Sequence, residues 1–167
     1  KPVCTRSLEP HALCDTFHGM YDFALDLHSW LRWATLIGGL VATLTAFTSG
    51  ASGKADRWAL IFMIVMDIQL LFGLALYLAL SPTTAAIFGD FGAAMRDPVA
   101  RFWAVEHVSL MLLAVIMAHL GRVLGRRART PEAKRKRMLF CFALSTILMI
   151  AGIPWPGMRA GRALFPQ

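Results

Sequence analysis

Ionisable side chains interrupt two apolar stretches of the sequence. His28 and Arg32 lie one helical turn apart in the string His-Ser-Trp-Leu-Arg-Trp, and Glu106 and His107 are adjacent in a later stretch. Such groups are expensive inside a membrane, so those that occur there usually face a partner, a cofactor or a water-filled cavity. Imidazole is a common axial ligand of haem, and helical bundles often hold cofactors between facing side chains. His28 and His107 are therefore candidate ligands of a haem b.

The depth of these residues in a membrane favours a different arrangement. If the outer boundary lies at His28 on one helix and at Phe102 on the other, His107 lies roughly 7 Å deeper than His28. Two axial ligands of one iron need nearly equal depths. Arg32 and Glu106 are matched in depth, because each lies one turn below the assumed boundary. We therefore expect these two to form an interhelical ion pair, with both histidines as hydrogen-bonding residues at the rim.

Three further polar residues lie in the apolar stretches. Asp67 and Gln69 are interpreted as structural residues that pair with each other or with a neighbouring subunit. His119 lies about 18 Å from His107 along its helix and cannot share a haem with it. A single histidine suffices to ligate the magnesium of a chlorophyll-type pigment or to hydrogen-bond a quinone, and both remain candidate ligands. No nucleophile with its base and no phosphate-binding loop is visible, so a hydrolytic or transferase enzyme is not expected.

The elements that position these residues are predicted to be transmembrane helices. Hydrophobic residues make up 57% of the 167-residue chain and charged residues only 16%, which is unlike a soluble domain. Four apolar runs of about 18 to 23 residues are long enough to cross a bilayer. The sequence predicts an all-α integral membrane four-helix bundle that contacts the lipid bilayer. Its helices are expected at about 22–48, 57–80, 98–124 and 131–153.

Capping signals mark the starts of two of these helices, at Asp97-Pro98 and at Thr130-Pro131. In each pair an N-capping side chain precedes a proline that suits the first helical position. The connection between the second and third helices, residues 81–96, carries apolar residues at helical spacing. We expect it to form an amphipathic helix in the outer membrane interface, with an ordinary loop as the alternative.

Lysine and arginine are concentrated in the first and third connections. Cytoplasmic loops retain such residues, so both termini are expected on the periplasmic side of a bacterial inner membrane. The cluster suits anionic lipid headgroups, and it lacks the base-stacking aromatic side chains of a nucleic-acid surface. The cations of these two connections are Lys54, Arg57, Arg122, Arg126, Arg127, Arg129, Lys134, Arg135, Lys136 and Arg137.

The chain divides into a polar N-terminal extension (1–19), the four-helix domain (20–157) and a short outer C-terminal tail (158–167). The extension holds Cys4 and Cys14 on the expected outer side, where oxidation is permitted. A disulfide between them is one candidate, and two free thiols are the alternative. A metal site is not expected there, because the spacing of the Cys and His residues fits no zinc pattern.

Several strings together carry a resemblance to a known family. They are Met20-Tyr21-Asp22, the His28 to Trp33 string, Gln69-Leu70-Leu71-Phe72-Gly73, Glu106-His107 and Ile153-Pro154-Trp155. From residue 20 to about residue 165 the chain resembles small four-helix bacterial membrane proteins that are loosely labelled cytochrome b-like. The resemblance implies haem binding. This chain departs from the family pattern at Asp67, where relatives often have a histidine.

Two functional classes remain. The sequence favours an accessory subunit of a larger energy-transducing complex, either a photosynthetic reaction centre with its antenna or a respiratory complex. The loops are short, no soluble catalytic domain is present, and wide apolar helix faces suit contact with other membrane subunits. The alternative is a small b-type cytochrome that transfers electrons, with His28 and His107 as haem ligands and Arg32 beside a haem propionate.

Overall fold

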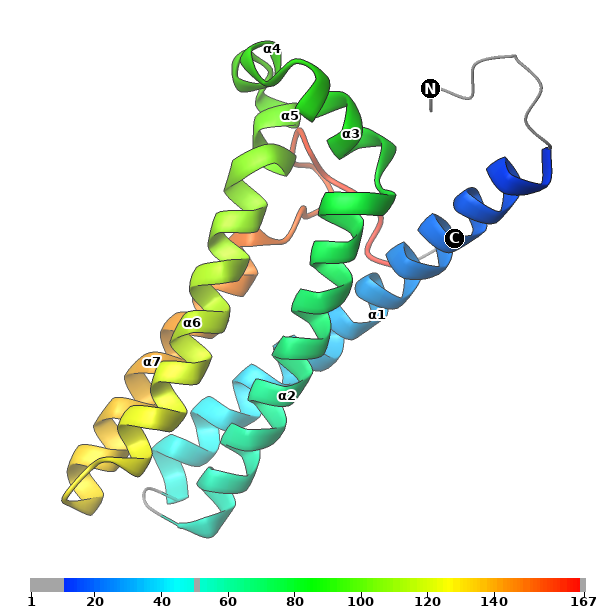
Figure 1. Ribbon diagram of the computed structural model, residues 1–167. Coiled ribbons are helices and arrows are strands. Elements are labelled where there is room, and N and C mark those ends of the chain that lie inside the picture. Colours follow the sequence, from blue (N-terminus) through cyan, green and yellow to red (C-terminus); the bar gives the residue numbers. More distant parts are fainter. Residues whose placement is uncertain (1–10, 50–51, 166–167) are drawn as a thin grey trace.

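Four long helices form most of the structure. The computed structural model describes residues 11–49 and 52–165, with side chains described from Thr16 onward, and it contains no strand in these ranges. The long helices are α1 (His11–Ser49), α2 (Gly53–Ala75), α6 (His107–Arg126) and α7 (Pro131–Gly152). Each contacts two others in the cyclic order α1, α2, α6, α7, as Figure 1 shows. The described chain is therefore all-helical, in agreement with the predicted fold class.

Short helical elements join α2 to α6. A π-helical turn, η1 (Leu76–Leu80), extends α2, and a second, η2 (Phe102–Glu106), leads into α6. Between them lie three short helices, α3 (Pro82–Gly89), α4 (Phe91–Arg96) and α5 (Pro98–Arg101). These three lie together at one end of the long helices (Figure 1). π-Helical turns are rare and often occur beside functional sites.

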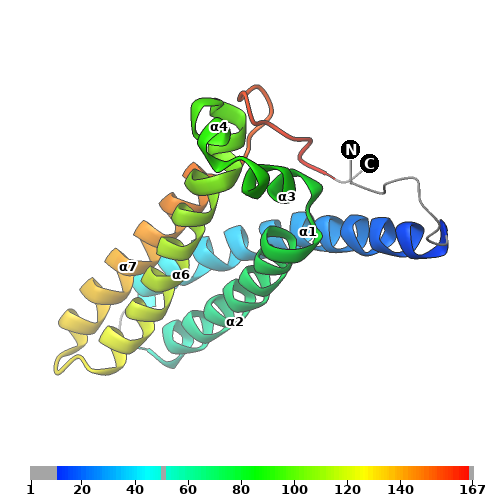
Figure 2. The same cartoon turned by 45° about the horizontal axis from the view of Figure 1, so that its top comes forward.

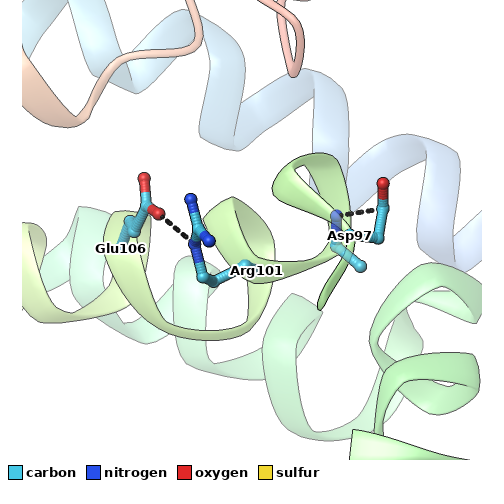
Figure 3. Close-up of polar contacts among 4 residues, drawn as sticks. Asp97, Arg101 and Glu106 are labelled. Carbon is cyan, nitrogen blue, oxygen red and sulfur yellow. Dashed lines mark hydrogen bonds and ion pairs between the residues drawn. The ribbon is translucent and has the colours of Figure 1, made fainter. Parts of the chain in front are cut away.

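The predicted capping signals are confirmed. A carboxylate oxygen of Asp97 accepts a hydrogen bond from the backbone N–H of Ala100 at 2.7 Å, at the start of α5 (Figure 3). The hydroxyl of Thr130 accepts one from the N–H of Ala133 at 3.2 Å, at the start of α7. These bonds satisfy backbone donors that have no partner within the helix.

The connection at residues 81–96 contains two helices instead of one. The side chain of Asp90 caps α4 by accepting from the N–H of Ala93 at 2.9 Å, and α3 ends just before it. Ile87 and Ala94 are buried in a small cluster with Ala104 of η2. Part of the apolar stripe therefore packs against the protein. Its placement in a membrane interface stays a prediction.

The first helix is longer than expected. α1 begins at His11, whereas the sequence analysis placed its start near residue 22. No proline lies between Pro10 and Pro82, so no residue of that kind interrupts the helix. Residues 11–19, expected in a polar extension, therefore form the first turns of α1. Figure 2 shows this part of α1 projecting beyond the other long helices.

Three helical segments of the described chain are long and apolar enough to cross a membrane. They are Thr16–Thr48, Gly53–Leu80 and Pro98–Arg126. Large apolar side chains on them face outward, including Ile37 at 61% exposure and Leu71 at 67%. α7 is not among the three, because charged residues occupy its first turns and leave a shorter apolar run. The chain is a helical, multi-pass membrane protein, and its fourth membrane span stays a prediction.

Small side chains allow the four long helices to pack closely. The hydroxyl of Ser145 on α7 is fully buried and donates to the carbonyl of Ala114 on α6 at 2.7 Å. The rings of Phe62 and Phe142 meet edge to face with centroids 5.9 Å apart. The main buried cluster is Ala42, Ala46, Ala55, Ala59, Phe62, Met66, Ala114, Ala118, Met138, Phe142 and Met149. This core fixes the long helices relative to one another, and these helices form the walls of a cavity.

Candidate functional site

A cavity of about 640 Å³ lies between the long helices, toward the end that carries the short helices. Its walls come from α1, α2 with η1, η2 with α6, the end of α7 and the segment that follows α7. Its volume is within the usual range of small-molecule and cofactor sites. Most of the exposed lining surface is apolar, but many polar side chains also line the cavity. They include Asp22, Asp26, His28, Arg32, Gln69, Tyr77, His107 and Arg162.

The two candidate haem ligands face each other in this cavity. The ring centroids of His28 and His107 are 6.4 Å apart, and the ring planes make an angle of 70°. The depth difference expected from the sequence therefore does not keep the two rings apart. It assumed that the outer boundary lies at His28, whereas α1 continues outward to His11. The two residues come from α1 and from the first residue of α6, directly after the π-helical turn η2.

Each histidine ring is held by one neighbouring polar group. Nδ1 of His107 lies 2.7 Å from the carbonyl oxygen of Gly152, and this contact orients the ring and leaves Nε2 available. Nε2 of His28 lies 3.4 Å from the amide nitrogen of Gln69, which also donates to the backbone carbonyl of His28 at 3.0 Å. Gln69 is thus a partner of His28 and not of Asp67.

Three buried polar atoms on residues of the cavity lining have no hydrogen-bond partner among the described residues. They are Nδ1 of His28, Nε of Arg32 and the side-chain oxygen of Gln69. A buried polar atom without a partner costs about 1–3 kcal/mol, so such atoms call for an explanation. Gly73 lies against the Cε1–Nδ1 edge of the His28 ring, since a Cβ there would lie 3.1 Å from Cε1 and 3.7 Å from Nδ1 of His28. The position of His28 therefore suits a ring that binds a ligand.

The expected ion pair between Arg32 and Glu106 is not formed. Arg32 donates from Nη2 to the backbone carbonyl of Leu164. Glu106 pairs with Arg101 at 2.9 Å, and both of these side chains are nearly half exposed (Figure 3). The prediction used depth alone, whereas Glu106 ends the π-helical turn η2, whose N-terminal neighbour is Arg101. Arg32 therefore does not pair with Glu106, and it lines the cavity instead.

Asp67 pairs with His119 outside the cavity. Nε2 of His119 lies 3.4 Å from a carboxylate oxygen of Asp67, and Nδ1 of His119 lies 3.0 Å from the carbonyl of Val115. Both side chains are about 40% exposed on the outer surface of α2 and α6. His119 does not line the cavity, as its distance from His107 along the helix predicted.

Sequence analysis missed the residues that close the cavity at the end of α7. Arg162 lines the cavity, with its guanidinium centred 4.5 Å from the ring of Trp103. Trp103 in turn lies 5.5 Å from His107, between ring centroids. Tyr77 also lines the cavity and donates to the carbonyl of Ala104 at 2.7 Å. The local signals for a turn after α7 were the prolines at positions 154 and 156 and the glycines at positions 157 and 161.

The other sequence candidates lie away from this site. Cys4 and the side chain of Cys14 lie outside the described residues, so their disulfide stays a prediction. Cys141 is a buried free thiol in α7. Within the described ranges, no three His, Cys, Asp or Glu side chains gather as a site for a bare metal ion. A haem needs only two protein ligands, because its macrocycle supplies the other four nitrogens.

Comparisons with known protein families, with curated proteins and with solved structures give no match to this chain.

Proposed function

We propose that this protein is a small b-type cytochrome of the bacterial inner membrane, which binds haem b between His28 and His107 and transfers electrons. The observation that carries the proposal is the pair of partly buried histidine rings that lie close together in one cavity. The resemblance to cytochrome b-like proteins, carried by motifs such as the His28 to Trp33 string and Glu106-His107, points the same way.

The spacing of the two rings fits ligation of one iron. Metal–nitrogen bonds of about 2 Å, with about 1.1 Å from nitrogen to ring centre, put two opposed imidazole centres about 6 Å apart. The observed separation is 6.4 Å. The 70° angle between the planes is acceptable because each ring is free to rotate about its metal–nitrogen bond.

The surrounding residues suit a redox cofactor. Haem b, when bound, supplies a one-electron couple whose potential depends on its axial ligands and on burial. Gly152 would orient His107 through its carbonyl, and Gln69 would orient His28. The apolar part of the lining would lower the local dielectric constant around a bound haem.

The proposal includes four membrane-spanning helices with both termini on the periplasmic side. The α1–α2 and α6–α7 connections lie at the same end of the long helices (Figure 1). An ion pair of 2.6 Å between Lys134 and Asp56 links these two regions. Their cations would face the cytoplasm under the positive-inside rule. α7 would then start in the headgroup region and enter the hydrocarbon at about Met138.

A role as accessory subunit of a photosynthetic or respiratory complex is the second candidate. One observation favours it, namely that α1 projects beyond the other long helices (Figure 2) and carries exposed large apolar side chains there. Phe17 is 61% exposed and Phe23 67% exposed. A neighbouring membrane subunit, its pigment or a quinone would bury this surface.

A reduced-minus-oxidised absorption spectrum tests the proposal. The protein would be purified gently from its native membrane, together with His28→Ala, His107→Ala and the control His119→Ala. We expect a haem b signal in the wild type and in the control, and its loss in both cavity variants. His119 is the matched control because it lies in a membrane helix but outside the cavity.

Two outcomes would contradict the cytochrome proposal. One is a haem signal that persists in both cavity variants. The other is haem-free protein that purifies as part of a large photosynthetic or respiratory assembly, which would support the accessory-subunit role.

A further inference from the structure

The segment after α7 folds back over the cavity as a strap, defined here as residues 153–165. Two backbone bonds fold it on itself, from Gly161 N to the Met158 carbonyl at 2.9 Å and from Arg162 N to the Pro154 carbonyl at 3.1 Å. A Cβ at Gly161 would lie 2.5 Å from the carbonyl oxygen of Trp155, so the turn requires glycine there. The strap is therefore a built part of the cavity wall.

The far end of the strap is fixed to α1. The carbonyl of Leu164 accepts from Arg32 and from the indole N–H of Trp33, the latter at 3.4 Å. The ring of Phe165 stacks on Trp33 with centroids 5.6 Å apart and planes 20° apart, and it also lies 5.6 Å from Trp30. These contacts bring Arg32 and the strap together at the cavity.

Each histidine of the cavity has an arginine close to it. Arg32 lies one helical turn from His28, and its Nε is buried without a hydrogen-bond partner in the described structure. Arg162 stacks on Trp103, which contacts His107. Neither arginine forms an ion pair with a described carboxylate. A partly buried guanidinium without an anion is costly in an apolar setting.

Acidic residues of the cavity mouth lie some distance away from Arg32. Asp26 and Asp22 line the mouth on α1 and are exposed. At 1.5 Å per residue they lie about 9 Å and about 15 Å from Arg32 along the helix axis. Neither of these carboxylates forms an ion pair with Arg32 or Arg162.

We propose that Arg32 and Arg162 form a carboxylate clamp, which selects a ligand carrying two carboxylates and directs them toward the strap. This inference rests on the proposed haem site and deepens it, because the two propionates of haem b are the carboxylates concerned. Guanidinium groups bind carboxylates through paired, charge-assisted hydrogen bonds. Arg162 belongs to the strap, so the clamp is complete only when the strap is closed over the cavity.

The experiment compares haem b with its dimethyl ester, which has the same iron and macrocycle but no carboxylates. Full-length apoprotein in detergent would be titrated with each compound, with binding followed by the absorption of the six-coordinate haem. A charged hydrogen bond contributes enough for about a tenfold preference or more. We expect the wild type to prefer haem b over the ester by at least that factor.

Arg32→Gln and Arg162→Gln should each reduce the preference, while the matched control Arg159→Gln should keep it. Arg159 is an exposed arginine of the strap that does not line the cavity. The ratio of the two affinities is the decisive quantity, because a general loosening of the strap would weaken the binding of both compounds alike.

The possible results separate the two proposals. Equal binding of haem b and the ester by the wild type would overturn the clamp and leave the haem site standing. A preference that survives in both Gln variants would also overturn it. If neither compound binds the wild type through His28 and His107, the haem site fails and the clamp fails with it.

Discussion

The close approach of α6 and α7 predicts that an added methyl group at Gly121 destabilises the protein. A Cβ at this position would lie 2.6 Å from Cε1 of Phe142 and 2.9 Å from Cβ of Cys141. Phe142 is fully buried against Phe62 and has little room to move. Such overpacking typically costs about 1–3 kcal/mol. The higher helix propensity of alanine offsets about 1 kcal/mol of this cost. Gly121→Ala should therefore lower the free energy of unfolding by up to about 2 kcal/mol.

Gly38 provides a matched control on α1. A Cβ there would lie 3.5 Å from the ring of Phe62, which is an ordinary contact. Because alanine has the higher helix propensity, Gly38→Ala should raise the free energy of unfolding by up to about 1 kcal/mol. Both variants would be unfolded with sodium dodecyl sulfate in mild detergent micelles, with helix content followed by circular dichroism. The reasoning would be refuted if Gly121→Ala proved as stable as Gly38→Ala.

Two further predictions concern polar contacts between the long helices. Ser145→Ala removes the bond from the buried hydroxyl to the carbonyl of Ala114, and should lower the free energy of unfolding by about 0.5–1 kcal/mol in the same assay. An unchanged unfolding midpoint would contradict this. Asp67→Leu and His119→Leu should be non-additive by at least about 0.5 kcal/mol in a double-mutant cycle, because each removes the same pair. Strict additivity would show that the two side chains do not interact.

Composition and local signals were enough to predict the helical class and most helix boundaries. The start of α7 at Pro131 and the capping at Asp97 follow from side chains that act on their own backbone neighbours. The start of α1 was predicted less well, because polarity in residues 11–19 was taken as a break in the helix. Polarity alone does not stop a helix, and α1 begins directly after Pro10.

The candidate site was harder to predict, because its geometry depends on how helices cross. His28 and His107 were identified from their residue type, but their close approach was not predicted, because their relative depth was inferred from an assumed boundary. Arg32 was assigned to Glu106 on the same ground, although its partner is the Leu164 carbonyl. Arg162 could not be placed at all, since only the turn after α7 brings it back to the cavity.

The strap also implies an order of assembly. Residues 153–165 follow all four long helices in the chain, and synthesis proceeds from the N-terminus. The histidines and the walls of the cavity are therefore inserted before the segment that covers them. During this interval the cavity is open at the end where Arg162 later lies. A bulky molecule has its easiest entry then, and docking of Phe165 between Trp30 and Trp33 would retain it afterwards.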